Sequence, residues 1–313
     1  MSPQAARVDL PALLREVPGD KAFGVPLARY TSWRIGGPAE ALVAVENLAA
    51  LCRLQAVARR HGLPLFVLGG GSNLLVRDGG IRGIVVLLRG AFRRYRLMAE
   101  DTTALVEVGA GYPLSRLALQ LGQQGWSGLE FAYGIPGTVG GAMVMNAGTS
   151  LGELGQVLVA ARLLLADGRV SELPVAALGL GYRTSSYPSQ AILLAARLRL
   201  HRGERAAIEA VMRQAYRQRQ RTQPLWLPNA GSVFKNPPGV AAGRLIEAAG
   251  LKGTRIGGAM VSPRHANFIV NVGGARAADV EALIALIRQR VWQAFGVLLE
   301  LEVRIVGEPA CSE

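Results

Sequence analysis

Hydrophobic positions along this chain recur with two different periods, and together they predict a protein of mixed helices and strands. Apolar residues return every three or four positions in four segments, which predicts helices. These segments are Leu48–His61, Pro113–Gln124, Glu204–Arg219 and Asp279–Phe295. Shorter apolar runs bounded by glycine or other turn residues predict strands. These runs are Ala41–Val45, Leu63–Leu68, Gly83–Leu88, Ala104–Val108, Val157–Leu165 and Ile192–Leu200.

The helical stripe of the third of these helices carries a charged residue. Arg219 follows Ile208, Met212 and Tyr216 at helical spacing, so the pattern puts its guanidinium on the apolar, inward side. An arginine on an inward face needs a partner, because burying an unpaired charge is costly.

The last apolar segment, Val297–Val306, alternates with the period of two that is typical of a strand. This alternation points Glu300, Glu302 and Arg304 to one face. The spacing does not say which glutamate matters, and an exposed strand face is the ordinary explanation of such a trio.

Length and composition narrow the class of protein. The chain has 313 residues, of which 50% are hydrophobic and 18% charged, so it can bury a large core and is not a disordered protein. Charges or glycines interrupt every apolar run, so no membrane insertion is expected. The first residues lack the apolar segment of an export signal, and a cytoplasmic location is expected. Two cysteines and three histidines make neither a disulfide framework nor a metal site.

The charge is strongly positive, and arginine carries almost all of it. The net charge is +13, and Lys21, Lys235 and Lys252 are the only lysines among 35 basic residues. Such a balance fits nucleic acid, but it also fits small molecules with phosphate groups, for which arginine offers paired donors. Because no zinc-finger spacing or aromatic RNA-binding pattern is present, nucleic acid is not the expected partner.

Two glycine-rich segments are the best candidates for a binding site. The first, Gly69–Leu74, directly follows an apolar strand, so its backbone N–H groups could surround a pyrophosphate. It is not a dinucleotide fingerprint, because Leu74 stands where the last glycine belongs. The second, Gly134–Ala142, mixes glycines with Pro136 and suits a loop packed against a flat ligand. A tight turn would explain either one alone; two of them favour a phosphate-bearing ligand or cofactor.

Three further motifs carry possible chemistry. Arg183 lies between Tyr182 and a run of hydroxyl residues, where it could stabilise developing negative charge. Ser232 and Lys235 fit the S-x-x-K pattern of acyl-serine enzymes, but the other elements of that class are missing. Ser232 could instead donate a proton, which would require a nearby cation and a carbanion-like acceptor. His265 and its neighbours are more simply read as structural.

Taken in order, these segments resemble the family of UDP-N-acetylenolpyruvoylglucosamine reductases, the MurB flavoenzymes. The segments that carry the resemblance are Thr31–Ala39, Gly70–Leu75, Gly134–Ala142, Asn146–Gly148, Gly181–Ser185, Ala230–Pro237, His265–Asn271 and Glu302–Gly307. Only 49 positions separate Arg183 from Ser232, so the chain is similar to the shorter subclass that lacks an extra tyrosine-bearing loop.

The resemblance implies an α+β fold in two parts. Residues 1–202 would form a two-lobed FAD-binding domain of the vanillyl-alcohol-oxidase type, with lobes at about 1–85 and 86–202. Residues 203–313 would form a smaller α+β substrate-binding domain. The protein would be a monomer that binds FAD without a covalent bond and takes NADPH and a UDP-sugar enolpyruvate as its partners.

The resemblance also implies roles for individual residues. Arg183 and Glu302 would stabilise the enol of the substrate, and Ser232 would donate the proton. The substrate contacts that it suggests are Tyr182, Arg219, Lys235 and Arg304. The residues expected to hold FAD are Gly69, Gly70, Gly71, Ser72, Asn73, Leu74, Ile135, Pro136, Gly137, Thr138, Gly140, Gly141, Asn146 and Gly148.

Two alternatives stay open at this point. Another flavin oxidoreductase of the same superfamily, acting on an alcohol or hydroxy acid, would need neither the serine motif nor Glu302. A basic nucleotide- or nucleic-acid-binding protein without catalysis would bind no flavin, and its binding to polynucleotide would depend steeply on salt.

Overall fold

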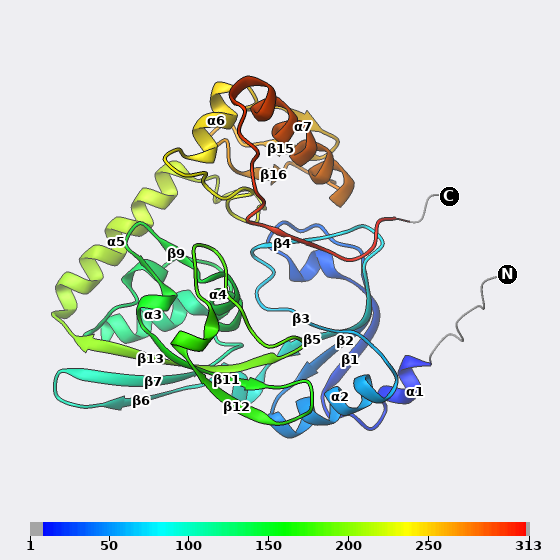
Figure 1. Ribbon diagram of the computed structural model, residues 1–313, viewed down its shortest axis with the longest axis vertical. Coiled ribbons are helices and arrows are strands. Elements are labelled where there is room, and N and C mark those ends of the chain that lie inside the picture. The colour runs from blue at the N-terminus through cyan, green and yellow to red at the C-terminus, as the bar shows by residue number, and fades with distance from the viewer. Residues whose placement is uncertain (1–8, 311–313) are drawn as a thin grey trace.

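The first part of the chain folds around a four-stranded sheet with the strand order β1-β2-β5-β3 (Figure 1). In the computed structural model, which describes residues 9–310, its strands are β1 (Asp20–Pro26), β2 (Pro38–Val45), β3 (Leu65–Val67) and β5 (Ile81–Leu88). Helices α1 (Leu10–Leu14) and α2 (Leu48–Arg60) share one hydrophobic cluster with β2 and β5. Helix α2 is therefore the crossover between parallel strands that its amphipathic pattern predicts.

The second part is a larger antiparallel sheet of order β12-β11-β13-β7-β6, with β8 also paired to β13. Its strands are β6 (Tyr95–Ala99), β7 (Thr103–Gly109), β8 (Trp126–Ser127), β11 (Leu158–Leu164), β12 (Val170–Pro174) and β13 (Ile192–Arg202). The helices packed against it are α3 (Leu114–Gln123), α4 (Val139–Met145) and α5 (Arg205–Thr222). Asp167 and Gly168, a residue pair typical of hairpin turns, form the turn between β11 and β12.

The C-terminal part combines a three-stranded sheet with two helices and lies at the top of Figure 1. Its elements are α6 (Ala242–Ala248), β14 (Arg255–Ile256), β15 (Ala259–Val261), β16 (Ile269–Asn271) and α7 (Ala277–Phe295). The predicted stripe of α7 is confirmed, since Val280, Leu283, Ile287 and Val291 are buried in its core.

Two contacts tie this C-terminal part to the first sheet. Trp33 is fully buried in the C-terminal core, and its indole Nε1 donates a 2.8 Å hydrogen bond to the carbonyl of Ile269. Strand β17 (Arg304–Val306) returns and pairs in parallel with β4 (Leu74–Val76), directly after the first glycine loop. The end of the chain is therefore fixed against the glycine loop by a strand pair.

The long final strand expected over Val297–Val306 is wrong in length, because only β17 is regular. Residues before it pair with an irregular partner: the amides of Glu302 and Val303 both donate to the carbonyl of Val233. The loop at Val233 does not provide the regular series of backbone hydrogen-bond partners that a strand needs, so the alternating residues before β17 do not form a regular strand. The alternation in burial persists, with Leu299 and Val303 buried and Glu300 exposed.

Helix α5 links the large sheet to the C-terminal part and runs diagonally between them in Figure 1. Ile208 and Met212 near its start join the core of the large sheet, so this end of the helix packs on the preceding part. The boundary at residue 202 stays a prediction.

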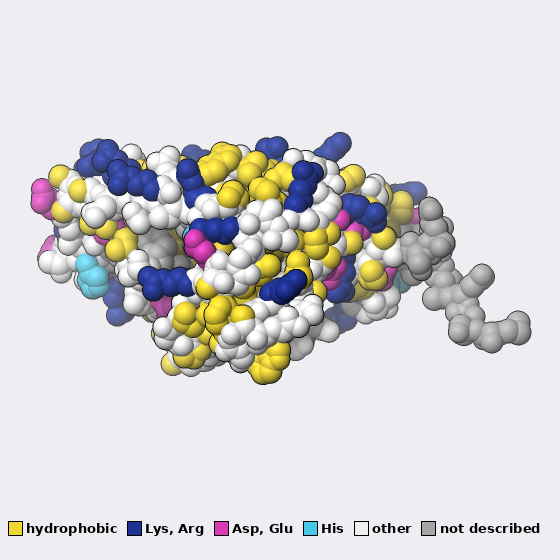
Figure 2. Space-filling view, turned by 90° about the horizontal axis from the view of Figure 1, so that it is seen from above, with side chains coloured by type: hydrophobic (Ala, Val, Ile, Leu, Met, Phe, Trp, Pro, Cys, Tyr) yellow, Lys and Arg dark blue, Asp and Glu magenta, His cyan; other side chains and the backbone are white. Residues whose placement is uncertain are grey.

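The remaining elements are short. They are strands β9 (Gly148–Thr149) and β10 (Gly152–Glu153) and the 3₁₀ helices Leu27–Tyr30, Gly90–Arg93, Glu130–Ala132, Leu154–Gln156 and Val175–Leu178. Across residues 9–310, no helix is both long and apolar enough to cross a membrane. Figure 2 shows lysine and arginine side chains in separate groups among hydrophobic and uncharged ones, so this face lacks the continuous basic track of a nucleic-acid-binding surface.

Candidate active site

A cavity of about 1190 Å³ brings together segments from all three parts of the fold. Both predicted glycine loops line it, as do Arg183, Ser232 and Glu302. These residues are far apart in the sequence, and the pairing of β17 with β4 brings Glu302 next to the first glycine loop. A large concave site with a few convergent polar groups is typical of an enzyme active site.

The two glycine loops touch each other along one wall of the cavity. A Cβ atom on Gly70 would lie 2.6 Å from the Cα of Gly137, so neither loop has room for a side chain here. Gly71 has a left-handed backbone, with φ of 58°, and a Cβ there would meet the carbonyl of Tyr30. Ser72 Oγ donates a 3.0 Å hydrogen bond to the carbonyl of Pro136 and joins the loops.

The second glycine loop leads into helix α4. Thr138 caps this helix, since its Oγ1 accepts a hydrogen bond from the amide of Gly141 at 3.3 Å. Gly140 faces away from the cavity and packs on Ala110, whereas Gly141 faces the cavity, and a Cβ there would meet only Thr138 Oγ1, at 3.6 Å. The wall is thus smooth backbone, which suits a flat, extended ligand with phosphate groups such as FAD.

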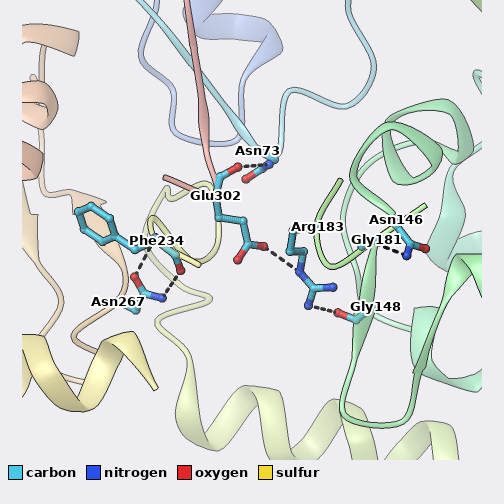
Figure 3. A network of polar contacts seen from close by, with 8 residues as sticks. All are labelled: Asn73, Asn146, Gly148, Gly181, Arg183, Phe234, Asn267 and Glu302. Atoms are coloured by element: carbon cyan, nitrogen blue, oxygen red, sulfur yellow. Dashed lines mark hydrogen bonds and ion pairs between the residues drawn. The ribbon is translucent and has the colours of Figure 1, made fainter. Parts of the chain in front are cut away.

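Arg183 and Glu302 form an ion pair that lines the same cavity (Figure 3). Arg183 Nε donates to Glu302 Oε1 at 3.2 Å, and Nη2 donates to the carbonyl of Gly148 at 2.8 Å. The two side chains are only 17% and 18% exposed. Because Nε and Nη2 are used by these two hydrogen bonds, Nη1 is the nitrogen of Arg183 that remains available to an anionic ligand.

Two asparagine side chains fix the backbone at or near both partners of this ion pair. Arg183 has a left-handed backbone, with φ of 56°, and Asn146 donates to the carbonyl of Gly181 just before it, at 3.1 Å. Asn73 Nδ2 donates to the backbone carbonyl of Glu302 at 2.9 Å. The first glycine loop therefore positions the glutamate directly.

The carboxyl group of Glu302 has an altered proton affinity. Burial raises its pKa above the ordinary glutamate value, although Arg183 and then Lys235 act in the opposite direction. Lys235 itself forms an ion pair with Glu300 at 3.6 Å. A carboxyl group with a raised pKa can hold a proton in a hydrogen bond to a substrate.

Ser232 lies in a loop that the C-terminal sheet fixes in place. Buried Asn267 accepts from the amide of Phe234 at 3.0 Å and donates to its carbonyl at 2.8 Å (Figure 3). The amide of Val233 donates to the carbonyl of Asn267 at 2.8 Å. Asn267 thus clamps the backbone just after Ser232, which confirms the expected structural role of the His265–Asn271 segment.

Arg219 lies on the cavity side of α5, as its inward position predicts. Its Nε is buried and has no hydrogen-bond partner among residues 9–310. Burial lowers the pKa of this guanidinium, and the nearby Tyr216 partly offsets that effect. A buried guanidinium without a partner is a strong candidate to receive an anionic group of a ligand.

Four of the residues expected in the site do not line the cavity. Gly140 packs on Ala110, and Asn146 is buried behind the wall as a clamp. Tyr182 is 48% exposed and lies beside the Arg183 guanidinium, 5.0 Å from the ring centre. Lys235 is paired with Glu300. The other expected residues all line the cavity, and they include the three proposed catalytic residues, Arg183, Ser232 and Glu302.

Two groups of residues that line the cavity were not predicted from the sequence. One is a face of α5 at helical spacing, made up of Val211, Gln214, Gln218 and Thr222, whose polar members gave no apolar signal. The other is a pair of large side chains in loops, Arg34 and Trp226. Arg34 has a left-handed backbone with φ of 55°, which is uncommon for arginine, but a backbone angle cannot be read from a sequence.

Within the described part of the chain, no three histidine, cysteine, aspartate or glutamate side chains are grouped so that they could hold a metal ion. Cys52 is a free, half-buried residue of α2, and Cys311 lies outside the described residues.

Two family models match this chain. Residues 39–174 match an FAD binding domain, and residues 223–306 match the C-terminal domain of UDP-N-acetylenolpyruvoylglucosamine reductase. The first range covers the two glycine loops, and the second covers Ser232 and Glu302. These matches, together with the mixture of helices and strands, confirm the expected α+β fold with an FAD-binding domain.

Full-length relatives are similar throughout. UDP-N-acetylenolpyruvoylglucosamine reductase 2 of Symbiobacterium thermophilum is 49% identical over 308 residues, which is 98% of each chain. The reductase of Rubrobacter xylanophilus is 48% identical and covers 92% of this chain and 95% of its own. The crystal structure of UDP-N-acetylenolpyruvylglucosamine reductase from Thermus caldophilus superposes with a TM-score of 0.80 at 40% identity, covering 93% of this chain and 99% of that one.

Proposed function

Because this chain belongs to the UDP-N-acetylenolpyruvoylglucosamine reductase family, we propose that it reduces the enolpyruvyl ether of a UDP-N-acetylglucosamine to a lactyl ether with electrons from NADPH. The chain is an FAD-dependent oxidoreductase of peptidoglycan precursor synthesis. The observation that supports the finer proposal most strongly is the meeting of Arg183, Ser232 and Glu302 with both glycine loops in one cavity. A cytoplasmic location is part of the proposal, since NADPH and nucleotide sugars are made there.

The glycine loops would hold the cofactor. Gly69–Leu74, Gly137 and Thr138 would offer backbone N–H groups, Ile135 and Pro136 would complete the second loop, and Gly141 extends the surface that lacks side-chain bulk. When bound, FAD supplies the hydride chemistry, taking a hydride from NADPH and delivering one to the methylene carbon of the enolpyruvyl group. Gly140 and Asn146 would act from behind the wall by keeping its backbone in place.

Arg183 and Glu302 would stabilise the negative charge that develops on the substrate. Hydride addition to the methylene carbon leaves a carbanion at the adjacent carbon, delocalised onto the carboxylate as an enolate. The unpaired part of the Arg183 guanidinium can bind that carboxylate. The raised pKa of Glu302 favours a protonated carboxyl group, which can donate a hydrogen bond to the same oxygens.

Ser232 would deliver the proton that completes the lactyl ether. A serine hydroxyl is a poor acid, but the enolate carbon is strongly basic, and the cations Arg183, Arg219 and Arg304 line the same cavity. The hydroxyl would recover its proton from solvent. Arg219 and Arg304 would also bind the carboxylate or diphosphate, with Tyr182 and Lys235 acting from the edge of the site.

The test of this role is Ser232→Ala, with Ser150→Ala as a matched control. Ser150 lines the same cavity but lies on the side of the Gly148 turn, and it carries no proposed role. We expect Ser232→Ala to bind FAD and to be reduced by NADPH at the wild-type rate, while reduction of the enolpyruvyl substrate slows about 10²- to 10⁴-fold. Ser150→Ala should keep both rates. Wild-type substrate turnover in Ser232→Ala would contradict the proton-donor role.

Arg183→Ala and Glu302→Gln test enol stabilisation separately. Both variants should retain FAD and its reduction by NADPH, and both should slow the step that reduces substrate. If either variant instead loses FAD, the residue supports the cofactor, and its assignment to the enol is wrong.

A further inference from the structure

We infer that Trp226 is a stacking platform for the base of a nucleotide that binds in this cavity, with Gln223 reading the edge of that base. The inference rests on the proposed function only in that the substrates named there are nucleotides. The platform lies in the turn that joins α5 to the Ser232 loop, at residues 223–227.

Trp226 is unusually exposed for a tryptophan that lines a cavity. Its exposed fraction is 60%, the same as that of Leu298 and larger than that of any other large hydrophobic residue among residues 9–310. Four of the ten such residues border the cavity. They are Leu151, Val211, Leu225 and Trp226. Apolar surface concentrated around one polar cavity indicates a ligand that covers it.

One face of the indole ring is already occupied. The guanidinium of Arg264 lies 4.1 Å from the ring centre, and its Nη1 donates to the carbonyl of Gln220 at 3.0 Å. Arg264 does not line the cavity, whereas Trp226 does and stays 60% exposed despite this contact. The contact restrains the ring on one face, and the other face is the one that a second flat group would cover.

The turn that carries Trp226 is held rigidly by one side chain. Asn229 Nδ2 donates to the carbonyls of Pro224 and Leu227, at 3.2 Å and 2.8 Å. Asn229 Oδ1 accepts from the amide of Gly231 at 3.0 Å, just before Ser232. The platform and the proposed proton donor are therefore parts of one preorganised loop, and a ligand that stacks on Trp226 is placed relative to Ser232.

Polar groups next to the ring match the rest of a nucleotide. Gln223 Oε1 is buried, borders the cavity and has no hydrogen-bond partner among the described residues. An N–H group on the edge of a base would satisfy it. Arg219, one helical turn earlier, has a buried Nε that also lacks a partner there. A flat ring, a free acceptor and a free cation that line one cavity fit a base and the phosphate of the same nucleotide.

The experiment measures nucleotide affinity of the FAD-loaded protein for Trp226→Ala, with Trp292→Ala as the matched control. Trp292 is 57% exposed but lies near the end of α7 and does not border the cavity. We titrate UDP and NADP⁺ by calorimetry and measure KM for the enolpyruvyl UDP-sugar. Loss of a stacked base should weaken binding of the nucleotide about 5- to 150-fold in Trp226→Ala. Trp226→Phe should recover most of it, and Trp292→Ala should resemble wild type.

The arms of the experiment separate the possible sources of the base. Weaker UDP binding with a raised KM for the sugar nucleotide assigns the platform to the uracil ring. Weaker NADP⁺ binding alone assigns it to a base of the pyridine nucleotide. Equal affinities in Trp226→Ala and Trp292→Ala overturn the inference, as does loss of FAD in Trp226→Ala, which would make the ring a cofactor contact. Since the calorimetric titrations of UDP and NADP⁺ need no turnover, a wild-type protein that binds them but fails to reduce the substrate would contradict only the proposed function.

Discussion

Replacing Gly141 with alanine should change the stability of the folded protein and its affinity for FAD in opposite directions. Gly141 lies in helix α4 and faces the cavity, and an added Cβ would meet no atom closer than 3.6 Å. The neighbouring Gly140 has the opposite environment, because its Cβ would come within 2.9 Å of the Ala110 side chain. The same substitution at adjacent positions therefore has opposite consequences for the protein alone.

The expected magnitudes follow from these surroundings. In the cofactor-free protein, Gly141→Ala should raise the free energy of unfolding by about 0.5–1 kcal/mol, because alanine loses less conformational freedom than glycine in a helix. Gly140→Ala should lower it by about 1–3 kcal/mol, since α4 must move away from Ala110. If FAD lies along this wall, the methyl group of Gly141→Ala occupies its space and costs about 1–3 kcal/mol of binding, or roughly 5- to 150-fold in affinity.

The assay combines denaturation with an FAD titration. Urea unfolding of the cofactor-free proteins gives the change in stability, and quenching of flavin fluorescence gives the dissociation constant. Gly141→Ala should be more stable than wild type without FAD and bind FAD more weakly. A variant that is stabilised but binds FAD with wild-type affinity would refute the placement of the cofactor against α4.

Three further predictions concern Glu302, Lys235 and Asn267. Because the pKa of Glu302 is raised, the folded state binds its proton more tightly than the unfolded state does. The free energy of unfolding of wild type relative to Glu302→Gln should therefore be greatest below the ordinary glutamate pKa and decrease as pH rises through the raised value. Urea unfolding across about pH 4–8 measures this difference. If protonated Glu302 is needed, the rate of substrate reduction should fall as pH rises through the pKa of Glu302. Lys235→Met should move this fall to higher pH, because it removes a positive charge that lowers the pKa of Glu302. The same pH–rate profile in Lys235→Met and wild type at saturating substrate would count against Glu302 as the titrating group. Asn267→Ala should lower the free energy of unfolding by about 2–4 kcal/mol, because two buried backbone groups of Phe234 lose their partners, and a loss below about 0.5 kcal/mol would show that the clamp is unimportant.

Much of the fold could be predicted because its elements carry their own local signals. Helix α2 begins at Asn47, whose side chain accepts a hydrogen bond from the Ala50 amide at 2.9 Å, and is followed by Gly62 in a left-handed conformation. Strands β2 and β5 are buried on both faces over residues 41–45 and 83–88, and these stretches contain no polar side chain. The final strand failed because pairing is a property of the partner: alternation in Val297–Val306 could not reveal that its neighbour is a loop.

Part of the candidate site could be predicted from the sequence and part could not. The glycine loops could be found because only glycine fits where Gly70 meets Gly137, and such density is visible in a sequence. Arg183, Ser232 and Glu302 came from the family resemblance, since no local pattern brings together residues 49 and 70 positions apart. Trp226 was not found at all, because its importance lies in its exposure and in the Arg264 contact, which depend on the folded chain.

The most direct test of the account is an anaerobic half-reaction with the purified, FAD-loaded protein. The protein is first reduced with one equivalent of NADPH and is then mixed with UDP-N-acetylglucosamine enolpyruvate. The account predicts that the visible absorption of oxidised flavin returns and that one lactyl ether forms for each FAD. A protein that is reduced by NADPH but stays reduced after the sugar nucleotide is added would contradict it.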